Sequence, residues 1–243
     1  MPEDQISPSL AAAWGRPRSQ SKGPKPGLGL DRIVAAGIRI ATHEGLSAVS
    51  MARVARELDA STMSLYRYVS AKEELLALMV DAALGPPPPR APDEEGWRAG
   101  LSRWAWGYHD RLREHPWVLR IPITGPPVSP HTVAWLEDGL CSLAGTGLSQ
   151  EGKASVVLLL SGYVRNEATL TADLAAAGLI DDAAMRNYTS VLRTLTDRSR
   201  FPALHELLDA GVFDRADDPD DEFTFGLERI LDGVEALINK LPS

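Results

Sequence analysis

The chain has 243 residues, of which 44% are hydrophobic and 24% charged, a globular composition long enough for one large or two smaller domains. Its one cysteine, Cys141, excludes an internal disulfide and a thiolate metal cluster. The longest strongly apolar run, VVLLL at 156–160, is far shorter than the roughly 20 residues of a membrane span, and the acidic start MPEDQ differs from a signal peptide. We expect a soluble, cytoplasmic protein without membrane contacts.

The net charge of −8, taken alone, argues against a nucleic-acid partner. The distribution of charge reverses that argument, because residues 14–72 hold ten lysines and arginines against four acidic residues. This segment carries +6 and the rest of the chain −14. Such asymmetry indicates a module that faces nucleic acid, joined to a part of another kind.

The first 27 residues are rich in Pro, Ser, Gly and Lys and lack hydrophobic periodicity, so we expect a disordered basic arm at 1–27. An apolar stripe at helical spacing predicts a helix over 30–44, which Gly45 ends. Ser50 is placed to cap a second helix, which ends near Asp59.

A third helix over 62–68 follows after only three residues, with Ser61 as its N-cap. Ser70 and Glu73 have the spacing of a capping box that opens a fourth helix. That helix continues to the segment GPPPPR, whose glycine and prolines must end it. Together these helices make a predicted domain over 28–84.

The second predicted domain, 92–243, also consists of helices. Helical patterns fit 93–115, 130–143 with Ser129 as N-cap, 149–177, 181–196, 202–210 and a last helix with an apolar seam from Leu227 to Leu241. The sequence has no convincing period-2 strand and no internal repeat, so the predicted fold class is all-α. From the sequence, the seam is covered either by the protein's own core or by a second subunit.

The stretch STMSLYRYV, residues 61–69, places Leu65 and Val69 on one helix face, while hydroxyls, an arginine and two tyrosines crowd the other. Two short helices joined by a short turn form a helix-turn-helix, whose second helix fits the major groove of DNA, about 12 Å wide. The face from Thr62 to Lys72 has no carboxylate that phosphate would repel. From periodicity and charge alone, an ordinary solvated face is an equal alternative.

The segment from Leu30 to Leu84 resembles the DNA-binding domain of the tetracycline-repressor (TetR) family of transcriptional regulators. The resemblance rests on a first helix that ends in EGL, on SMARVARELD, on SLYRYV and on KEELL at the start of the fourth helix. The C-terminal FGLERILDGVEALI is similar to the last helix of one subfamily. The resemblance implies a homodimer that binds a near-palindromic DNA operator, and a C-terminal domain for dimerisation and for a small-molecule effector. The effector would change the spacing of the recognition helices, with the fourth helix carrying the movement.

Carried over by position, the resemblance implies base contacts from Thr62, Met63 and Ser64. It implies contacts to the DNA backbone from Ser50, Tyr66, Tyr68 and Lys72. Arg67 faces the groove by helical count and is added as a base or phosphate contact. Where the family usually has glycine in the turn, this chain has Asp59, which tolerates the left-handed conformation but places a negative charge near DNA.

Five of the six tryptophans lie between 97 and 135. Packing is the simpler explanation for those on the apolar stripe, such as Trp104, whereas Trp106 lies off it and is expected to line a cavity, cover a helix or be exposed. In the helix over 149–177, a face that includes Leu159 and Leu170 acquires a phenol, an amide and a carboxylate, which suits a small-molecule site. Pairing of Glu167 with an arginine, or its exposure, is the alternative. The candidate ligand-binding residues are Trp104, Trp106, Tyr108, Trp135, Tyr163, Asn166 and Glu167.

Two functions other than a ligand-released repressor are considered, of which the first is an enzyme. The histidines are scattered and no HExxH, GxSxG or phosphate-loop motif occurs, so we expect no enzymatic activity, no cofactor and no bound metal. The other rival is a helical ligand-binding or interaction protein whose helix-turn-helix no longer binds DNA. The net acidity and Asp59 favour that rival, and the local positive charge opposes it.

Overall fold

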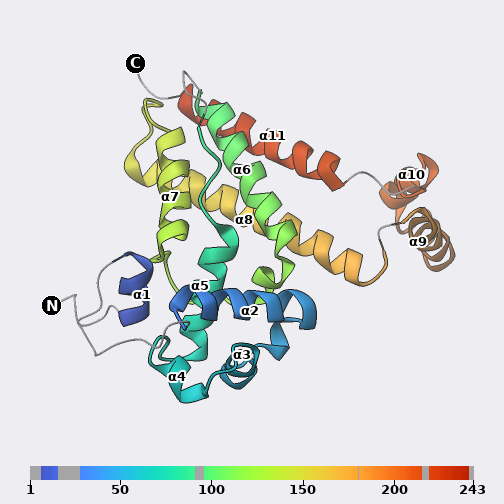
Figure 1. Ribbon diagram of the computed structural model, residues 1–243. Coiled ribbons are helices and arrows are strands. Elements are labelled where there is room, and N and C mark those ends of the chain that lie inside the picture. Colours follow the sequence, from blue (N-terminus) through green and yellow to red (C-terminus); the bar gives the residue numbers. More distant parts are fainter. Residues whose placement is uncertain (1–6, 16–27, 91–95, 180, 215–218, 241–243) are drawn as a thin grey trace.

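The computed structural model describes residues 7–15, 28–90, 96–179, 181–214 and 219–240, and every regular element in these ranges is a helix (Figure 1). This confirms the predicted all-α class. Within the same ranges, none of the helices combines the length and the apolar character needed to cross a membrane.

The N-terminal domain is formed by α2 (Leu30–Glu44), the 3-10 turn η2 (Leu46–Ala48), α3 (Met51–Glu57), α4 (Thr62–Tyr66) and α5 (Lys72–Leu84). Helices α2 and α5 cross so closely that a Cβ on Gly37 would lie 2.6 Å from the Sδ of Met79. Ile33, Leu75 and Met79 are fully buried at this crossing. Close packing of this kind fixes α5 against the rest of the N-terminal domain.

Glycines end two of these helices, as the sequence predicts. Gly45 follows α2 with φ of 86°, and Gly85 follows α5 with φ of 57°. These left-handed values strain a residue that has a Cβ, so each glycine allows the chain to leave the helix sharply.

The prediction of a disordered arm is wrong for residues 7–15, which contain α1 (Pro8–Ala13). Residues 1–6 and 16–27 lie outside the described residues. Ser7 caps α1 by accepting a hydrogen bond from the backbone N–H of Leu10 at 3.2 Å. Apolar periodicity could not reveal α1, because the helix has only six residues and its buried position is a serine, Ser9.

The predicted capping box at the start of α5 is also wrong. Ala71 holds the N-cap position, and no side chain caps the helix there. The backbone N–H of Ser70 donates instead to the carboxylate of Glu74. The helix begins one residue later than the box requires, so the glutamate that reaches back is Glu74 and not Glu73.

The C-terminal domain contains α6 (Trp97–Glu114), the 3-10 helix η3 (Pro116–Arg120), α7 (Pro130–Ser142), α8 (Gln150–Ala176), α9 (Asp182–Leu195), α10 (Pro202–Asp209) and α11 (Pro219–Ile238). Helices α6, α7, α8 and α11 pack together, whereas α9 and α10 form a pair beyond the ends of α8 and α11 (Figure 1). Leu101, Leu112, Leu160 and Leu227 are buried at the centre of this bundle.

The predicted face of α8 is only partly correct. Its buried residues are Val156, Val157, Leu160, Val164 and Ala168. Leu159 and Leu170 are 56% and 50% exposed, and Asn166 is also exposed. The sequence pattern failed here because α8 is apolar on two sides, of which one faces the bundle and the other is uncovered in the single chain.

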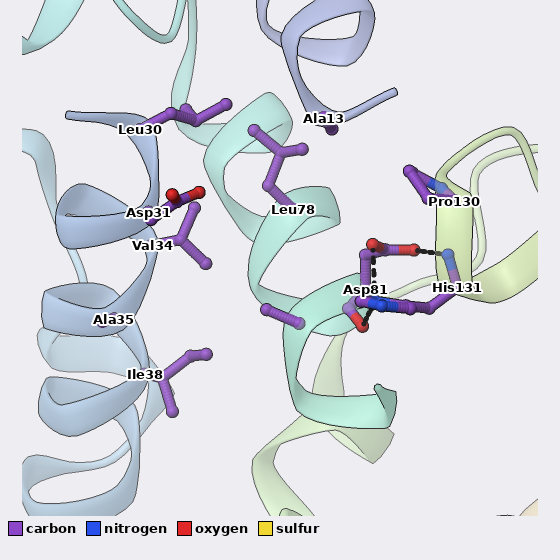
Figure 2. Close-up of a pocket in the computed structure, with 11 residues that line it drawn as sticks. Ala13, Leu30, Asp31, Val34, Ala35, Ile38, Leu78, Asp81, Pro130 and His131 are labelled. Atoms are coloured by element: carbon purple, nitrogen blue, oxygen red, sulfur yellow. Dashed lines mark hydrogen bonds and ion pairs between the residues drawn. The ribbon is translucent and has the colours of Figure 1, made fainter. Parts of the chain in front are cut away.

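The two domains meet where α5 lies beside α7. Asp81 of α5 is buried, and its Oδ1 accepts the backbone N–H groups of His131 at 2.8 Å and Thr132 at 3.1 Å. Its backbone carbonyl and Oδ2 lie 3.0 and 3.1 Å from Nδ1 of His131 (Figure 2). Ser129 occupies the N-cap position as predicted but makes no cap bond, so the first turn of α7 is capped by the other domain.

Candidate nucleic-acid interface and ligand site

The helix-turn-helix consists of α3, residues 58–61 and α4. Ser50 caps α3 by accepting the N–H of Arg53 at 3.1 Å, and Ser61 caps α4 by accepting the N–H of Ser64 at 3.2 Å. Asp59 has φ of 51° and, among the described residues other than glycine, is alone in having a positive φ. The turn therefore keeps the left-handed geometry expected of it without glycine.

Helix α4 presents one face to the protein and another to solvent. Leu65 is fully buried and so is Val69 just after the helix, as predicted. Met63 is 75% and Tyr66 46% exposed on the outer side. The other two predicted base-contact residues, Thr62 and Ser64, are half-buried. Leu65 anchors α4 to the protein, while Met63 and Tyr66 leave its outer face open to contact with another macromolecule.

Helix α4 ends at Tyr66, so Arg67 and Tyr68 lie in the turn before α5 and not in the predicted helix over 62–68. Tyr68 is half-buried, and its hydroxyl donates to the carbonyl of Leu28 at 2.9 Å. A phenol has one proton to donate, so a phosphate contact from Tyr68 requires this bond to be exchanged. Lys72 is the first residue of α5, where the helix N-terminus favours an anion.

Two acidic residues of the basic segment are held by arginine. Nε of Arg53 lies 3.2 Å from Glu44, and Nη1 lies 3.0 Å from Glu57. The hydrogen bond from Arg53 lowers the pKa of Glu44. Arg39 lies 3.6 Å from Glu57. These pairs reduce the repulsion that the two carboxylates would exert on phosphate.

Trp104 and Trp135 form an aromatic cluster with Tyr108 between α6 and α7. The two tryptophans are 2% and 3% exposed and meet edge-on at 5.8 Å, and Tyr108 lies 5.4 and 5.5 Å from them. Nε1 of Trp104 donates to the carbonyl of Trp135 at 2.8 Å, and Nε1 of Trp135 donates to the carbonyl of Gly85 at 2.9 Å. Because both indole N–H groups are satisfied, this cluster joins the bundle to the end of α5.

A second aromatic cluster surrounds Phe223 between α6, α8 and α11. Phe223 is 1% exposed, and its ring lies 4.1 Å from His109 and 4.6 Å from Trp106. Tyr163 stacks on it at 5.6 Å and donates its hydroxyl to the Phe223 carbonyl at 2.8 Å. Trp106 is half-buried, and its ring meets that of Phe223 of α11 edge-on.

The cluster around Phe223 contains polar groups in unfavourable surroundings. Nδ1 of His109 is buried and has no hydrogen-bond partner within the described residues, and burial lowers the pKa of this histidine. Burial, followed by the charges of Glu167 and Glu222, raises the pKa of Tyr163 to about 12. Burial also raises the pKa of Glu167. Buried polar groups require partners, and Nδ1 of His109 lacks one among the described residues.

The structure brings together Trp106, Tyr163 and Glu167 but separates them from the cluster of Trp104, Tyr108 and Trp135. Asn166 is exposed, which contradicts the predicted face. Sequence reasoning missed His109 and Phe223. Phe223 precedes Leu227 and Leu231 by four and eight positions, so the apolar seam could have been extended by one turn to find it.

Within the described residues, no group of three or more His, Cys, Asp or Glu side chains is placed to hold a metal ion.

A helix-turn-helix unit joined through one shared helix to a second helical domain defines a DNA-binding regulator of two domains. The family described as "Bacterial regulatory proteins, tetR family" matches residues 33–79. The family described as "Tetracyclin repressor-like, C-terminal domain" matches residues 88–238. The chain therefore belongs to the TetR family of bacterial transcriptional regulators.

Individual relatives match nearly the whole chain. It is 37% identical over 239 residues to the HTH-type transcriptional repressor DrrR1 of Streptomyces coeruleorubidus, which covers 96% of this chain and 87% of that protein. Apo ActR from Streptomyces coelicolor has a TM-score of 0.76 at 28% identity, covering 89% of this chain and 99% of that chain. ActR in complex with actinorhodin has a TM-score of 0.74 at 29% identity, covering 87% and 97%.

Proposed function

We propose that the protein is a transcriptional repressor that binds a near-palindromic operator as a homodimer and is released by a small-molecule ligand. The observation that carries the proposal is α4, which presents Met63 and Tyr66 to solvent above buried Leu65. The repressor DrrR1 supports the direction of control, and the complex of ActR with actinorhodin supports a ligand. The protein acts by binding and has no catalytic role.

In the proposed complex α4 enters the major groove. Thr62, Met63 and Ser64 contact base edges, with Arg67 beside them. The phosphate contacts come from Ser50, Tyr66, Tyr68 and Lys72. In a dimer with two-fold symmetry, the two copies of α4 read half-sites about 34–36 Å apart, which is one turn of DNA.

The proposed ligand binds among α6, α8 and α11. Trp106, Tyr163 and Glu167 line the site together with His109 and Phe223, while Trp104, Tyr108 and Trp135 pass the change to α5 through the bond from Trp135 to Gly85. A ligand that releases the repressor must bind the DNA-free conformation more tightly, and such coupling amounts to about 1 to 3 kcal/mol.

The proposed dimer is formed by α8 and α11, which pack side by side (Figure 1). Both helices leave large apolar side chains uncovered in the single chain: Leu158 is 74% exposed, Leu159 56%, Phe225 63% and Leu237 45%. Apolar surface of this extent on neighbouring helices favours a second copy as its cover.

The test is selection from a randomised DNA duplex library by the purified protein, followed by sequencing of the retained DNA. Tyr66→Ala is compared with Tyr188→Ala on α9, because the two tyrosines are 46% and 48% exposed. We expect one palindromic motif for the wild type and for Tyr188→Ala, and its loss for Tyr66→Ala. No enrichment by the wild type would favour the rival function, a helical ligand-binding or interaction protein with a helix-turn-helix that does not bind DNA.

A further inference from the structure

The joint between the two domains lies where α5 meets α7, and it includes hydrogen bonds made by Asp81. Asp81 fixes the first turn of α7 to α5 through the backbone N–H groups of His131 and Thr132. Beside this contact, an open crevice of about 270 Å³ lies where α2, α5 and α7 meet (Figure 2). The crevice is lined by Leu30, Val34, Ile38, Leu78 and Pro130, among others. The flank of the joint beside Asp81 is therefore not filled by side chains.

Helix α1 is attached to the α5 side of this joint. Ser9 is 1% exposed, and its hydroxyl donates to the carboxylate of Glu74 in the first turn of α5. Glu74 also accepts the backbone N–H of Ser70. A buried hydroxyl requires a partner, so this bond holds α1 in one position on α5.

The other end of α1 is attached to the α7 side. Nε1 of Trp14 donates to the carbonyl of Val128, just before α7, at 2.9 Å. Ala13 lines the crevice together with Leu78 and His131 (Figure 2). The six residues from Ser9 to Trp14 therefore connect the start of α5 to the segment that leads into α7.

We propose that α1 is a strap across the joint, which restrains the turning of α5 relative to α7 and thereby holds α4 in the orientation that binds the operator. Turning of α5 away from α7 must break the bond of Ser9 to Glu74 or that of Trp14 to Val128. The restraint acts on the same joint through which the proposed ligand signal passes. Its effect on DNA rests on the proposed function, whereas its effect on the joint does not.

Hydrogen–deuterium exchange of the His131 and Thr132 amides in the full chain tests the strap without DNA or ligand. We expect Ser9→Ala and Trp14→Phe each to speed this exchange by about fivefold, the factor for losing one hydrogen bond from the closed state. Deletion of residues 2–15 should speed it further. Pro8→Ala, at an exposed position of the same helix, is the control and should leave the rate unchanged. Unchanged rates in the deletion variant, or an equal rise in Pro8→Ala, would overturn the strap.

A second measurement uses the DNA motif selected by the wild type. We expect Trp14→Phe and the deletion variant to bind it several-fold more weakly than Pro8→Ala does. Faster amide exchange with undiminished DNA affinity would show that the strap does not set operator binding. If the wild type selects no DNA, the proposed function fails while the exchange experiment still decides whether α1 restrains the joint.

Discussion

At the scale of single residues, Asp59 suits the left-handed turn, but its negative charge opposes binding to DNA. Its backbone is left-handed, with φ of 51°, which aspartate tolerates and glycine adopts freely. Its carboxylate lies between the two helices proposed to contact DNA. Stability and DNA affinity therefore depend on different properties of this one side chain.

Three substitutions at Asp59 separate these properties. We expect Asp59→Gly to be at least as stable as the wild type and Asp59→Ala to be less stable by about 1 kcal/mol, because alanine tolerates the left-handed region poorly. Asp59→Asn keeps the backbone preference but loses the charge, so it should bind DNA more tightly at unchanged stability. Urea unfolding and titration with the selected DNA measure the two effects. Equal stability of the Ala and Gly variants would mean that the turn is not left-handed in solution.

His109 should make stability depend on pH. Burial lowers its pKa in the folded protein below the unfolded value of about 6.5, so folding favours the neutral ring. The contribution of His109 to the free energy of unfolding is fully present above about pH 6.5 and is lost as pH falls through the pKa of the folded state. We expect His109→Phe, which keeps a ring against Phe223, to lose less stability than the wild type between pH 7 and pH 5. Burial also lowers the pKa of His115, which is present in both proteins. The effect of His109 is therefore the difference in stability between the wild type and His109→Phe at each pH. Parallel pH profiles would contradict the prediction.

At the scale of elements, the exposed apolar side of α8 is expected to form the dimer. Leu159→Glu places a charge on this side and should give monomers with strongly reduced operator affinity, since burial of an unpaired carboxylate costs several kcal/mol. Leu195→Glu, on α9 at a position that is 76% exposed, is the control and should remain dimeric. Analytical ultracentrifugation measures the mass. A dimeric Leu159→Glu protein would place the interface elsewhere.

The helices that the sequence predicted correctly are those whose signals are local. Gly45 ends α2, and Ser50 and Ser61 cap α3 and α4, because a cap or a stop depends on neighbours within one turn. The capping of α7 by Asp81 joins residues 50 positions apart, and no local pattern indicates it.

The cluster around Phe223, where we propose the ligand binds, was predicted less well for the same reason. Trp106 and Tyr163 could be proposed from their own helices, but the cluster forms only when α11 brings Phe223 between them. Likewise, α1 is defined by the contacts of Ser9 and Trp14 with residues far along the chain. These features depend on contacts between segments far apart in the chain. Hydrophobic periodicity in a single sequence reports helices and strands but not such contacts.

At the scale of the whole molecule, a net charge of −8 coexists with the proposed binding to a polyanion. Attraction is local, since charges further apart than about 8 Å are largely screened at physiological salt. We expect operator affinity to fall steeply with salt, and Lys72→Ala to reduce the slope of log affinity against log salt by about 1, the loss of one phosphate contact. Lys240→Ala, beyond the end of α11, should leave the slope unchanged. An unchanged slope for Lys72→Ala would remove Lys72 from the phosphate contacts.

The hydrogen bonds from Trp104 to Trp135 and from Trp135 to Gly85 also have an optical consequence. Two buried indoles, one of them bonded to the last turn of the helix that supports the DNA-binding unit, emit at short wavelength as long as they stay dry and bonded. A shift of α5, as proposed, would take the carbonyl of Gly85 away from the indole N–H of Trp135 and let water replace it. The natural fluorescence of the protein should then report the movement of the joint in real time, without any attached dye.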